Sequence, residues 1–551
     1  MSFKINKEQQ LKLDDRFLNA NERTKKFVLG SWAKGFAEII FPAINEERFA
    51  VLYSETSGSR PNNPVNGTIG ALILKEMLTL TDDELLASIL CDVRFQYALH
   101  TTSFEEQPFS DRTFSRFRER LYRYEQETGK DLLQEEMEAM AAVFTDYLTI
   151  EPGMKRMDSV MVASSCKMMS RLEILYTCTA NMVKVLHQAD QSTISKDLSH
   201  YLEAEDLNRT IYHRKSEDIT SRLQQVIDDA TRLIAEFGDA AFLLPEYQLL
   251  QRVLMEQTEP DPTGKAIPKD KKSIAPQSLQ NPSDPDATFR RKAGKKHQGY
   301  VGNIVETFDD QGAIITGYDY AINSHSDSQF CKETIEKLGT QNEPTVLLAD
   351  GAYASTDNHE QAAQNNIELV TTALLGKVPN PIQGEFIIDS DKQEVLECPA
   401  GNSPYKTSYY NETGMYRASF DKKTCESCPF NTQCGVKFQQ KSAVVMISEK
   451  MIQRASYLKK MSTDEYRDLS KKRNGVEGIP SILRRRYHVD HIPVRGLVRS
   501  KIWFSFKIGA INAKRVLKRA ASLLQKSVFS QTLHYFLPNH RLGERLLNLA
   551  A

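Results

Sequence analysis

Residues 345–353 read TVLLADGAY, an apolar run that ends on an acid and is followed at once by a glycine. Such a run is typical of a buried strand, and Gly351 lets the chain turn sharply after it. Segments that look like strands and helices alternate on both sides. The strand-like ones are HQGYVGNIVETF at 297–308, GAIITGYDYAI at 312–322 and IELVTTALL at 367–375, and the helix-like ones are QFCKETIEKLG at 329–339 and STDNHEQAAQNN at 355–366. A hairpin followed by this alternation predicts an α/β fold with a mixed sheet flanked by helices.

The composition is that of a soluble globular protein of 551 residues, with 40% hydrophobic and 26% charged residues. A chain of this length is expected to form several domains. The N-terminus, MSFKINKEQQLKLDD, lacks the apolar core of a signal peptide, and no apolar run is long enough to span a membrane. No GxxxxGK[ST] motif occurs, so a nucleotide cofactor is not indicated.

The net charge of -1 hides a strongly basic segment late in the chain. Residues 471–519 hold 14 Lys and Arg, opposed only by Glu477 and Asp490. A local patch of this kind binds phosphates whatever the charge of the whole chain. DNA is therefore the expected partner, and the expected phosphate contacts are Arg484, Arg485 and Arg486. The aromatic rings of Trp503 and Phe504 are expected to pack this segment onto the sheet.

The N-terminal region is mostly helix-like. Thr81 and Glu84 form a capping-box pattern that opens one helix, and Ser110 can cap the next, SDRTFSRFRERLYRYEQ. The second helix carries arginines four residues apart along one face: Arg112, Arg116 and Arg120. Two capped helices with arginines on the second are typical of a helix-turn-helix variant that binds DNA. The alternative is a solvated face in a plain helical bundle.

Three separated acids have the contexts that a two-metal centre needs. Asp158 lies in MKRMDSVMV, Asp350 ends the stretch quoted above, and Glu477 lies in the helix-like KKRNGVEGIPSILRRR. Two Mg²⁺ or Mn²⁺ ions held by such carboxylates drive phosphodiester cleavage and transfer, and Mg²⁺ prefers hard oxygen ligands. For each acid alone the alternative is a structural role, because an acid at a strand end commonly caps the turn that follows.

Four of the eight cysteines cluster in the sequence: Cys398, Cys425, Cys428 and Cys434. In a chain without an export signal, clustered cysteines favour a metal over disulfides. Four thiolates can hold a structural Zn²⁺ ion in a tetrahedral site. The alternative is a set of reduced cysteines in a small insertion.

The Pro- and Lys-rich residues 257–286 are expected to form a flexible linker. Asp284 and Asp286 at its end are interpreted as positioning residues rather than metal ligands. Asp327 is expected to cap the helix that follows it.

Taken together, four segments resemble the DDE transposases of bacterial insertion sequences, closest to the insertion-sequence 1182 branch. They are RPNNPV through SDRTFSRFRERL, MDSVMVASS around Asp158, LLADGAYAS around Asp350 and RNGVEGIPSILRRR around Glu477. The family signature places an Arg four residues before its third acid and a basic residue seven after it. Arg473 and Arg484 match those places, whereas Ser470 stands where the family has a Tyr.

The resemblance implies an RNase-H-like core in which Asp158, Asp350 and Glu477 are the catalytic metal ligands. It implies that Arg473 and Arg484 hold the DNA backbone near the scissile phosphate. Lys296 and His297 are expected to be further DNA contacts. The implied activity is cleavage at the ends of the element, followed by attack of the freed 3′-hydroxyl on target DNA. A non-catalytic DNA-binding protein and a divergent RNase-H-like nuclease are the alternatives.

The implied partners are double-stranded DNA of the terminal inverted repeats and target DNA. Because the reaction joins two DNA ends, a homodimer is expected, in the bacterial cytoplasm and on the nucleoid when bound. The predicted segments are a helical, helix-turn-helix-like DNA-binding domain at 1–148, the first part of the catalytic core at 149–170, a helical insertion and linker at 171–285, the second part of the core at 286–376, a Cys-rich insertion and candidate zinc module at 377–450, a helical third part of the core with a basic DNA-binding face at 451–525, and a tail at 526–551.

Overall fold

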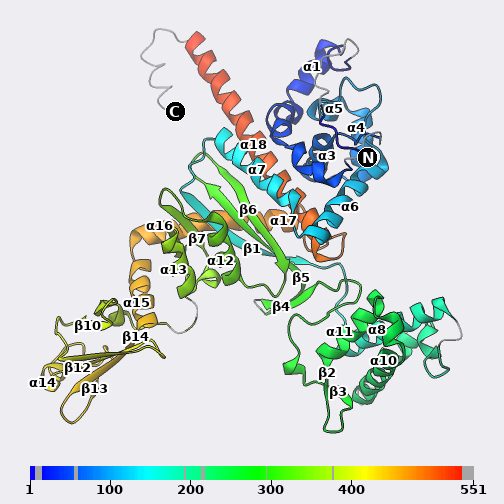
Figure 1. Cartoon of the computed structure of the whole chain (residues 1–551). Coiled ribbons are helices and arrows are strands. Elements are labelled where there is room, and N and C mark those ends of the chain that lie inside the picture. The colour runs from blue at the N-terminus through cyan, green and yellow to red at the C-terminus, as the bar shows by residue number, and fades with distance from the viewer. Residues whose placement is uncertain are drawn as a thin grey trace.

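The computed structural model describes residues 1–6, 15–54, 60–190, 194–212, 218–292, 294–374, 376 and 378–536, with the backbone alone from 523 onward. A twisted sheet lies at the centre, and three lobes surround it (Figure 1). In the described part of the chain, no helix combines the length and the apolar character that a membrane crossing requires. The predicted tail lies partly in the last helix, and residues 537–551 fall outside the described residues.

The central sheet is mixed, as the sequence predicted. Its strands run in the order β4-β5-β1-β7-β8, with β6 also paired to β5. β1 is antiparallel to β5 and parallel to β7, while β7 is parallel to β8. This order is compatible with an RNase-H-like fold. The strands are β1 (Met154–Ala163), β4 (Thr288–Lys292), β5 (Lys295–Phe308), β6 (Ala313–Ile322), β7 (Thr345–Ala349) and β8 (Ile367–Thr371).

Helices cover both faces of the sheet. On one face, α12 (Asp327–Leu338) and α13 (Thr356–Gln364) pack against an apolar cluster that includes Met157 and Val301. On the other face lies α18 (Leu497–Phe536). The ring of Phe504 on α18 is fully buried, and a Cβ at Gly302 of β5 would lie 2.7 Å from it. The prediction that Phe504 packs this helix onto the sheet is therefore confirmed.

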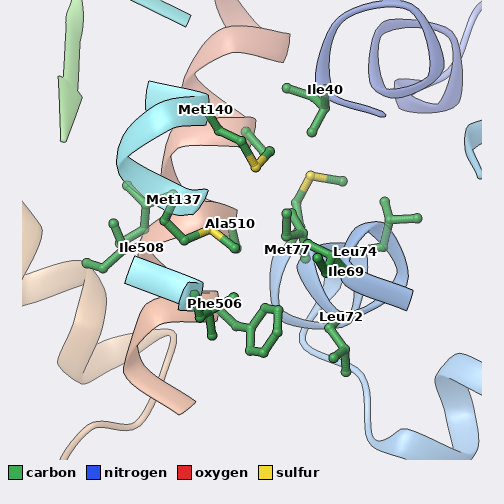
Figure 2. Close-up of a cluster of buried hydrophobic side chains, with 14 of the residues drawn as sticks. Ile40, Ile69, Leu72, Leu74, Met77, Met137, Met140, Phe506, Ile508 and Ala510 are labelled. Atoms are coloured by element: carbon green, nitrogen blue, oxygen red, sulfur yellow. The ribbon is translucent and has the colours of Figure 1, made fainter. Parts of the chain in front are cut away.

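The N-terminal helices share one hydrophobic core with the sheet and α18. Figure 2 shows side chains of α3, α7 and α18 meeting in this core, among them Leu74, Met137 and Phe506. The helices approach closely, since a Cβ at Gly509 would lie 2.6 Å from the sulfur of Met137. The helices of this region are α1 (Glu22–Leu29), α2 (Trp32–Gly35), α3 (Val65–Leu78), α4 (Asp82–Cys91), α5 (Val93–Ala98), α6 (Asp111–Thr128) and α7 (Leu132–Tyr147).

Both predicted helix starts in this region are confirmed. Thr81 and Glu84 form a reciprocal capping box at the start of α4. Ser110 and Thr113 form a second one at the start of α6. The side-chain oxygens satisfy backbone N–H groups that have no partner within the helix, which fixes where each helix begins.

Two insertions form the other lobes (Figure 1). The helical one has its own core, in which Val226 and Ile227 are buried. Its main helices are α8 (Arg171–Ala189), α10 (Ile219–Ala241) and α11 (Pro245–Gln257). The Cys-rich one is a sheet in the order β11-β12-β14-β13 with a short helix. Its elements are β11 (Lys406–Tyr410), β12 (Met415–Phe420), α14 (Lys422–Glu426), β13 (Lys437–Phe438) and β14 (Ala443–Ser448).

The expectation of a flexible linker over 257–286 is wrong for the end of this segment, whereas residues 258–277 are exposed or half-buried. Two short paired strands, β2 (Thr258–Pro260) and β3 (Ala266–Pro268), lie in it, and Leu279 and Asp284 are fully buried. Proline and lysine content does not reveal that the residues from Ser278 onward pack between the helical insertion and the sheet.

Asp284 ties together three elements of the core. It accepts hydrogen bonds from the hydroxyls of Ser164 and Tyr300, both at 2.5 Å, and from the backbone N–H of Gly496 at 2.9 Å. Exposed Asp286 accepts from Leu497 N–H at 2.8 Å, at the start of α18. An acid at a helix N-terminus is also favoured by the helix dipole. This geometry agrees with the interpretation of both acids as positioning residues.

Asp284→Ala should lower the free energy of unfolding by about 3 kcal/mol, because it leaves buried donors without partners. Asp286→Ala is the matched control and should cost about 1 kcal/mol or less, since its bond is exposed to water. Urea unfolding followed by tryptophan fluorescence reports on this region because Trp503 lies on α18. Equal costs for the two substitutions would contradict the anchoring role of Asp284.

Candidate active site

Asp158 lies on β1, and Asp350 follows the neighbouring parallel strand β7. Asp158 sits within β1, opposite Ile304 of β5, and its carboxylate accepts a hydrogen bond from Ser159 N–H at 2.9 Å. Asp350 directly follows β7, and its carboxylate accepts from Ala352 N–H at 2.7 Å, which closes the turn after the strand. Asp350 therefore caps the turn, which is the structural role given above as the alternative to metal binding. Its other carboxylate oxygen still faces the site.

The turn after β7 admits only glycine at position 351. A Cβ there would lie 2.8 Å from Cβ of Ala373 and 2.9 Å from its carbonyl oxygen. The segment ADGAY thus folds sharply against the end of β8. This turn holds the Asp350 side chain at the carboxyl end of β7.

Glu477 reaches the same place from the helical segment that follows the Cys-rich insertion. That segment comprises α15 (Glu449–Met461), α16 (Asp464–Arg473), a short 3-10 turn (Asn474–Glu477) and α17 (Gly478–Arg485). Glu477 is therefore at the end of a tight turn rather than inside one continuous helix. Its side chain is 58% exposed, whereas that of Asp158 is 14% exposed.

The three acids converge on the guanidinium of Arg473. Nη1 of Arg473 donates to Glu477 at 2.6 Å, while Nη2 lies 3.2 Å from Asp158 and 3.9 Å from Asp350. The arginine side chain is only 9% exposed. The chain thus gathers three carboxylates, from positions more than 300 residues apart, around a single positive charge.

The pKa of Asp158 is raised by burial, and the charge of Arg473 opposes that rise. Asp350 adds a further upward contribution, because two neighbouring carboxylates disfavour each other's charge. An acid pair of this kind is stable in its charged form only beside a cation.

Arg156 holds the junction between α16, which ends at Arg473, and the turn that carries Glu477, and the sequence did not single it out. Its Nη1 donates to the carbonyl of Lys472 at 2.9 Å, and a Cβ at Gly475 would overlap its guanidinium. Arg156 also pairs with buried Glu306. Arg156 precedes Asp158 by two residues, and side chains two apart share one face of a strand. That spacing is the one signal that could have identified it.

A group of cations flanks the acids on the side of β4. Lys292 donates to the hydroxyl of Ser159 at 3.3 Å, and both Lys292 and Arg290 pair with Asp327, at 3.5 Å and 3.2 Å. Asp327 was expected to cap α12, and this is wrong: the cap is Ser326, whose hydroxyl accepts from the helix. The side chain of Asp327 is buried, and its partners are the two cations of β4.

The predicted DNA contacts fall on four elements, namely α6, β5, α16, which carries Arg473, and α17 with the residue that follows it. His297 of β5 lies close enough to Arg484 of α17 that this charge, after burial, lowers the pKa of the imidazole. Lys296 is exposed beside it on β5, and Arg485 is exposed on α17. Arg486 follows α17 and donates to the carbonyl of Met77 at 3.3 Å, so it also ties this turn to α3.

The predicted arginines of the N-terminal helices lie on α6, away from the elements that carry the acids. Arg112 and Arg116 are exposed. Arg120 is half-buried, with its guanidinium 4.6 Å from the ring centre of Tyr53. On the predicted face of α6, Arg112 and Arg116 are therefore available to a ligand, while Arg120 partly packs against Tyr53.

The four clustered cysteines line one small cavity of about 20 Å³ in the Cys-rich insertion. They are free thiols, and burial together with the other three raises the pKa of Cys425 to about 11. The backbone N–H of Phe430 donates to the sulfur of Cys428 at 3.4 Å. Over the described residues, however, no three His, Cys, Asp or Glu side chains are already arranged as ligands of a metal ion. This holds for the cysteines and for the acids, between which Arg473 stands.

Two family models match the chain. The model described as transposase DDE domain matches residues 397–517, a range that includes Arg473 and Glu477. The model described as transposase domain (DUF772) matches residues 31–120, within the N-terminal helices. No curated protein and no solved structure gives a significant match. Asp158 and Asp350 lie outside both matched ranges, and the 1182 branch stays a prediction. Both matched families are transposases, and together they support a DDE transposase of the insertion-sequence type.

Proposed function

We propose that this protein is a DNA transposase that cleaves the ends of its insertion sequence and joins the 3′-hydroxyls to target DNA by two-metal chemistry. The observation that carries the proposal is the convergence of Asp158, Asp350 and Glu477 on one cation at the edge of the mixed sheet. Acids grouped beside a basic face repel DNA phosphates unless cations lie between them. This favours a catalytic site over a purely DNA-binding protein, and both matched families are transposases.

The donor set fits the proposed metal. Asp158, Asp350 and Glu477 would hold Mg²⁺ or Mn²⁺, since hard carboxylate oxygens that already face a cation are the ligands these ions prefer. Bound there, the ions supply activation of the attacking oxygen and neutralisation of the leaving one. The strand and the capped turn hold Asp158 and Asp350 in position, and exposed Glu477 lies on the side open to DNA.

The DNA would approach over the hairpin of β4 and β5 and along α17. Lys292, Lys296 and His297 of the hairpin and Arg484 and Arg485 of α17 are the proposed phosphate contacts. Cations on two neighbouring elements can follow a curved backbone on both sides of the scissile phosphate. Arg112 and Arg116 on α6 are the proposed contacts to the terminal repeats. Because two element ends react together, the proposed active form is a homodimer.

Asp350→Asn should reduce cleavage of an element-end duplex by about 1,000-fold or more, because it removes a charge that the metal ions need. Asp357→Asn is the matched control: this exposed acid lies seven residues further on, in α13, and its loss should leave cleavage unchanged. The measurement is strand cleavage in Mg²⁺ on denaturing gels, with DNA affinity determined in parallel. Normal cleavage by Asp350→Asn would overturn the metal assignment.

Replacing Arg484 and Arg485 together by Ala should weaken binding to any duplex and lower the log–log salt slope of affinity by about two units. Sequence preference should not change, because phosphate contacts carry no base information. Arg486 is left in place because it bonds to Met77. Lys332→Ala with Lys337→Ala, on α12, removes the same charge elsewhere and should leave the slope nearly unchanged. A variant that kept its salt slope and lost its preference for element ends would instead mean that α17 contacts bases.

We also propose that Cys398, Cys425, Cys428 and Cys434 hold a structural Zn²⁺ ion. The support is the shared cavity, together with backbone N–H groups that donate to the sulfurs of Cys428 and Cys434, since such bonds stabilise thiolates. The thiolate set fits zinc, and binding would bring the four sulfurs around this cavity within bonding distance of the ion.

Protein purified without added zinc should contain a stoichiometric amount of it by elemental analysis. Cys428→Ser should lose most of that zinc and make the Cys-rich insertion sensitive to protease, because structural zinc contributes to folding. Cys91→Ser, an exposed cysteine of α4, is the control and should keep both. Zinc-free wild-type protein with an intact insertion would refute the site.

A further inference from the structure

Arg473 occupies the space between the carboxylates that the proposed function assigns to metal ions. Its two terminal nitrogens contact all three acids, and its side chain is nine-tenths buried. A guanidinium and a divalent cation in this space would use the same carboxylate oxygens. The two charges cannot both be there, because like charges a few ångströms apart in a partly buried site repel strongly.

The backbone that carries Arg473 is anchored by several contacts, so the movement considered is that of its side chain alone. Arg156 holds the turn at Lys472 and Gly475. Arg156 is itself held by buried Glu306, which also pairs with Arg515 of α18 at 2.6 Å. These contacts link the turn to both the sheet and α18. A metal ion that enters the site would therefore displace the side chain of Arg473 and leave the anchored turn in place.

The Nε of Arg473 is a second observation that points to an alternative position of the side chain. This atom is buried and has no hydrogen-bond partner among the described residues. A buried donor without a partner is costly, and the guanidinium regains one by turning toward an acceptor outside the acid cluster. Phosphate oxygens suit it well, since arginine binds them with two parallel hydrogen bonds.

We infer that Arg473 is an internal counter-cation that holds the three carboxylates together before metal binds and moves from them to a DNA phosphate when metal enters. The inference rests on the proposed function, because it assigns the displacing ion and the receiving phosphate to that reaction. It makes Arg473 a positioning residue that couples two ligands. By linkage, DNA must then tighten metal binding by the same factor by which metal tightens DNA binding.

The test measures the affinity of the full chain for Mn²⁺, by electron paramagnetic resonance of the free ion, with and without duplex DNA. Wild type should bind Mn²⁺ about tenfold tighter when DNA is present, within the usual range of such couplings. Arg473→Met should bind Mn²⁺ about tenfold tighter than wild type without DNA, and DNA should then add little. Arg473→Lys should lie between them, since one ammonium cannot contact all three acids as the planar guanidinium does.

Arg467→Met, an exposed arginine of α16 six residues earlier, is the matched control and should behave as wild type. Because Arg473→Met leaves the acids without their cation, its melting temperature is measured as well, and Mn²⁺ should raise it more than that of wild type. Equal or weaker Mn²⁺ binding by Arg473→Met overturns the inference, and so does a coupling to DNA that survives the substitution. If Asp350→Asn still loses Mn²⁺ in those cases, the proposed function stands, whereas absence of Mn²⁺ binding by wild type with DNA overturns both.

Discussion

Three carboxylates share one guanidinium where β1, β7 and the turn after α16 meet, and the geometry of the candidate site depends on this ion cluster. Asp158 is largely buried, and burial of a charge is costly unless an opposite charge accompanies it. Arg473 provides that charge. Its own position depends on Arg156, and Arg156 depends on the buried Glu306 of β5. Each charged group in this series therefore has a partner of opposite sign, from the sheet edge to the acids.

The shared hydrophobic core gives the cluster a rigid base. α18 packs on the sheet through Phe504 and on the N-terminal helices through the region around Gly509. The helix α18 is also linked to the site, because its Arg515 pairs with Glu306, the partner of Arg156. One helix thus connects the N-terminal helices, the sheet and the site. The proposed DNA contacts on α6 and the three acids therefore belong to one packed body.

The two insertions lie where they leave the sheet intact. The helical one enters between β1 and β4, and the Cys-rich one follows β8, which is an edge strand of the sheet. The chain returns from the first through Asp284, which bonds to Ser164 near the end of β1 and to Gly496 before α18. It returns from the second through α15 and α16, which place Glu477 at the sheet edge. After each insertion, the chain thus comes back to the sheet in a position that serves the site.

The sequence alone was enough for features that a few neighbouring residues encode. The alternation of apolar runs predicted the mixed sheet, and the capping pattern of Thr81 and Glu84 predicted the start of α4. The contexts of Asp158, Asp350 and Glu477 were enough to nominate them, and the structure brings them together, although their catalytic role stays a proposal. Periodicity and caps are local, because they depend on side chains within one or two turns or strands.

Only the tertiary structure decided which charges neutralise which. Arg473, expected to bind DNA, lies among the acids, and Asp327, expected to cap a helix, pairs with Arg290 and Lys292. The stretch 257–286, expected to be a linker, ends in residues that are packed into the core around Asp284. The role of Arg156 depends on a turn 316 residues further along the chain. Such pairings follow from strand order and burial, because the strength of a charge interaction is set by distance in space and by exclusion of water, and neither is written in the local sequence.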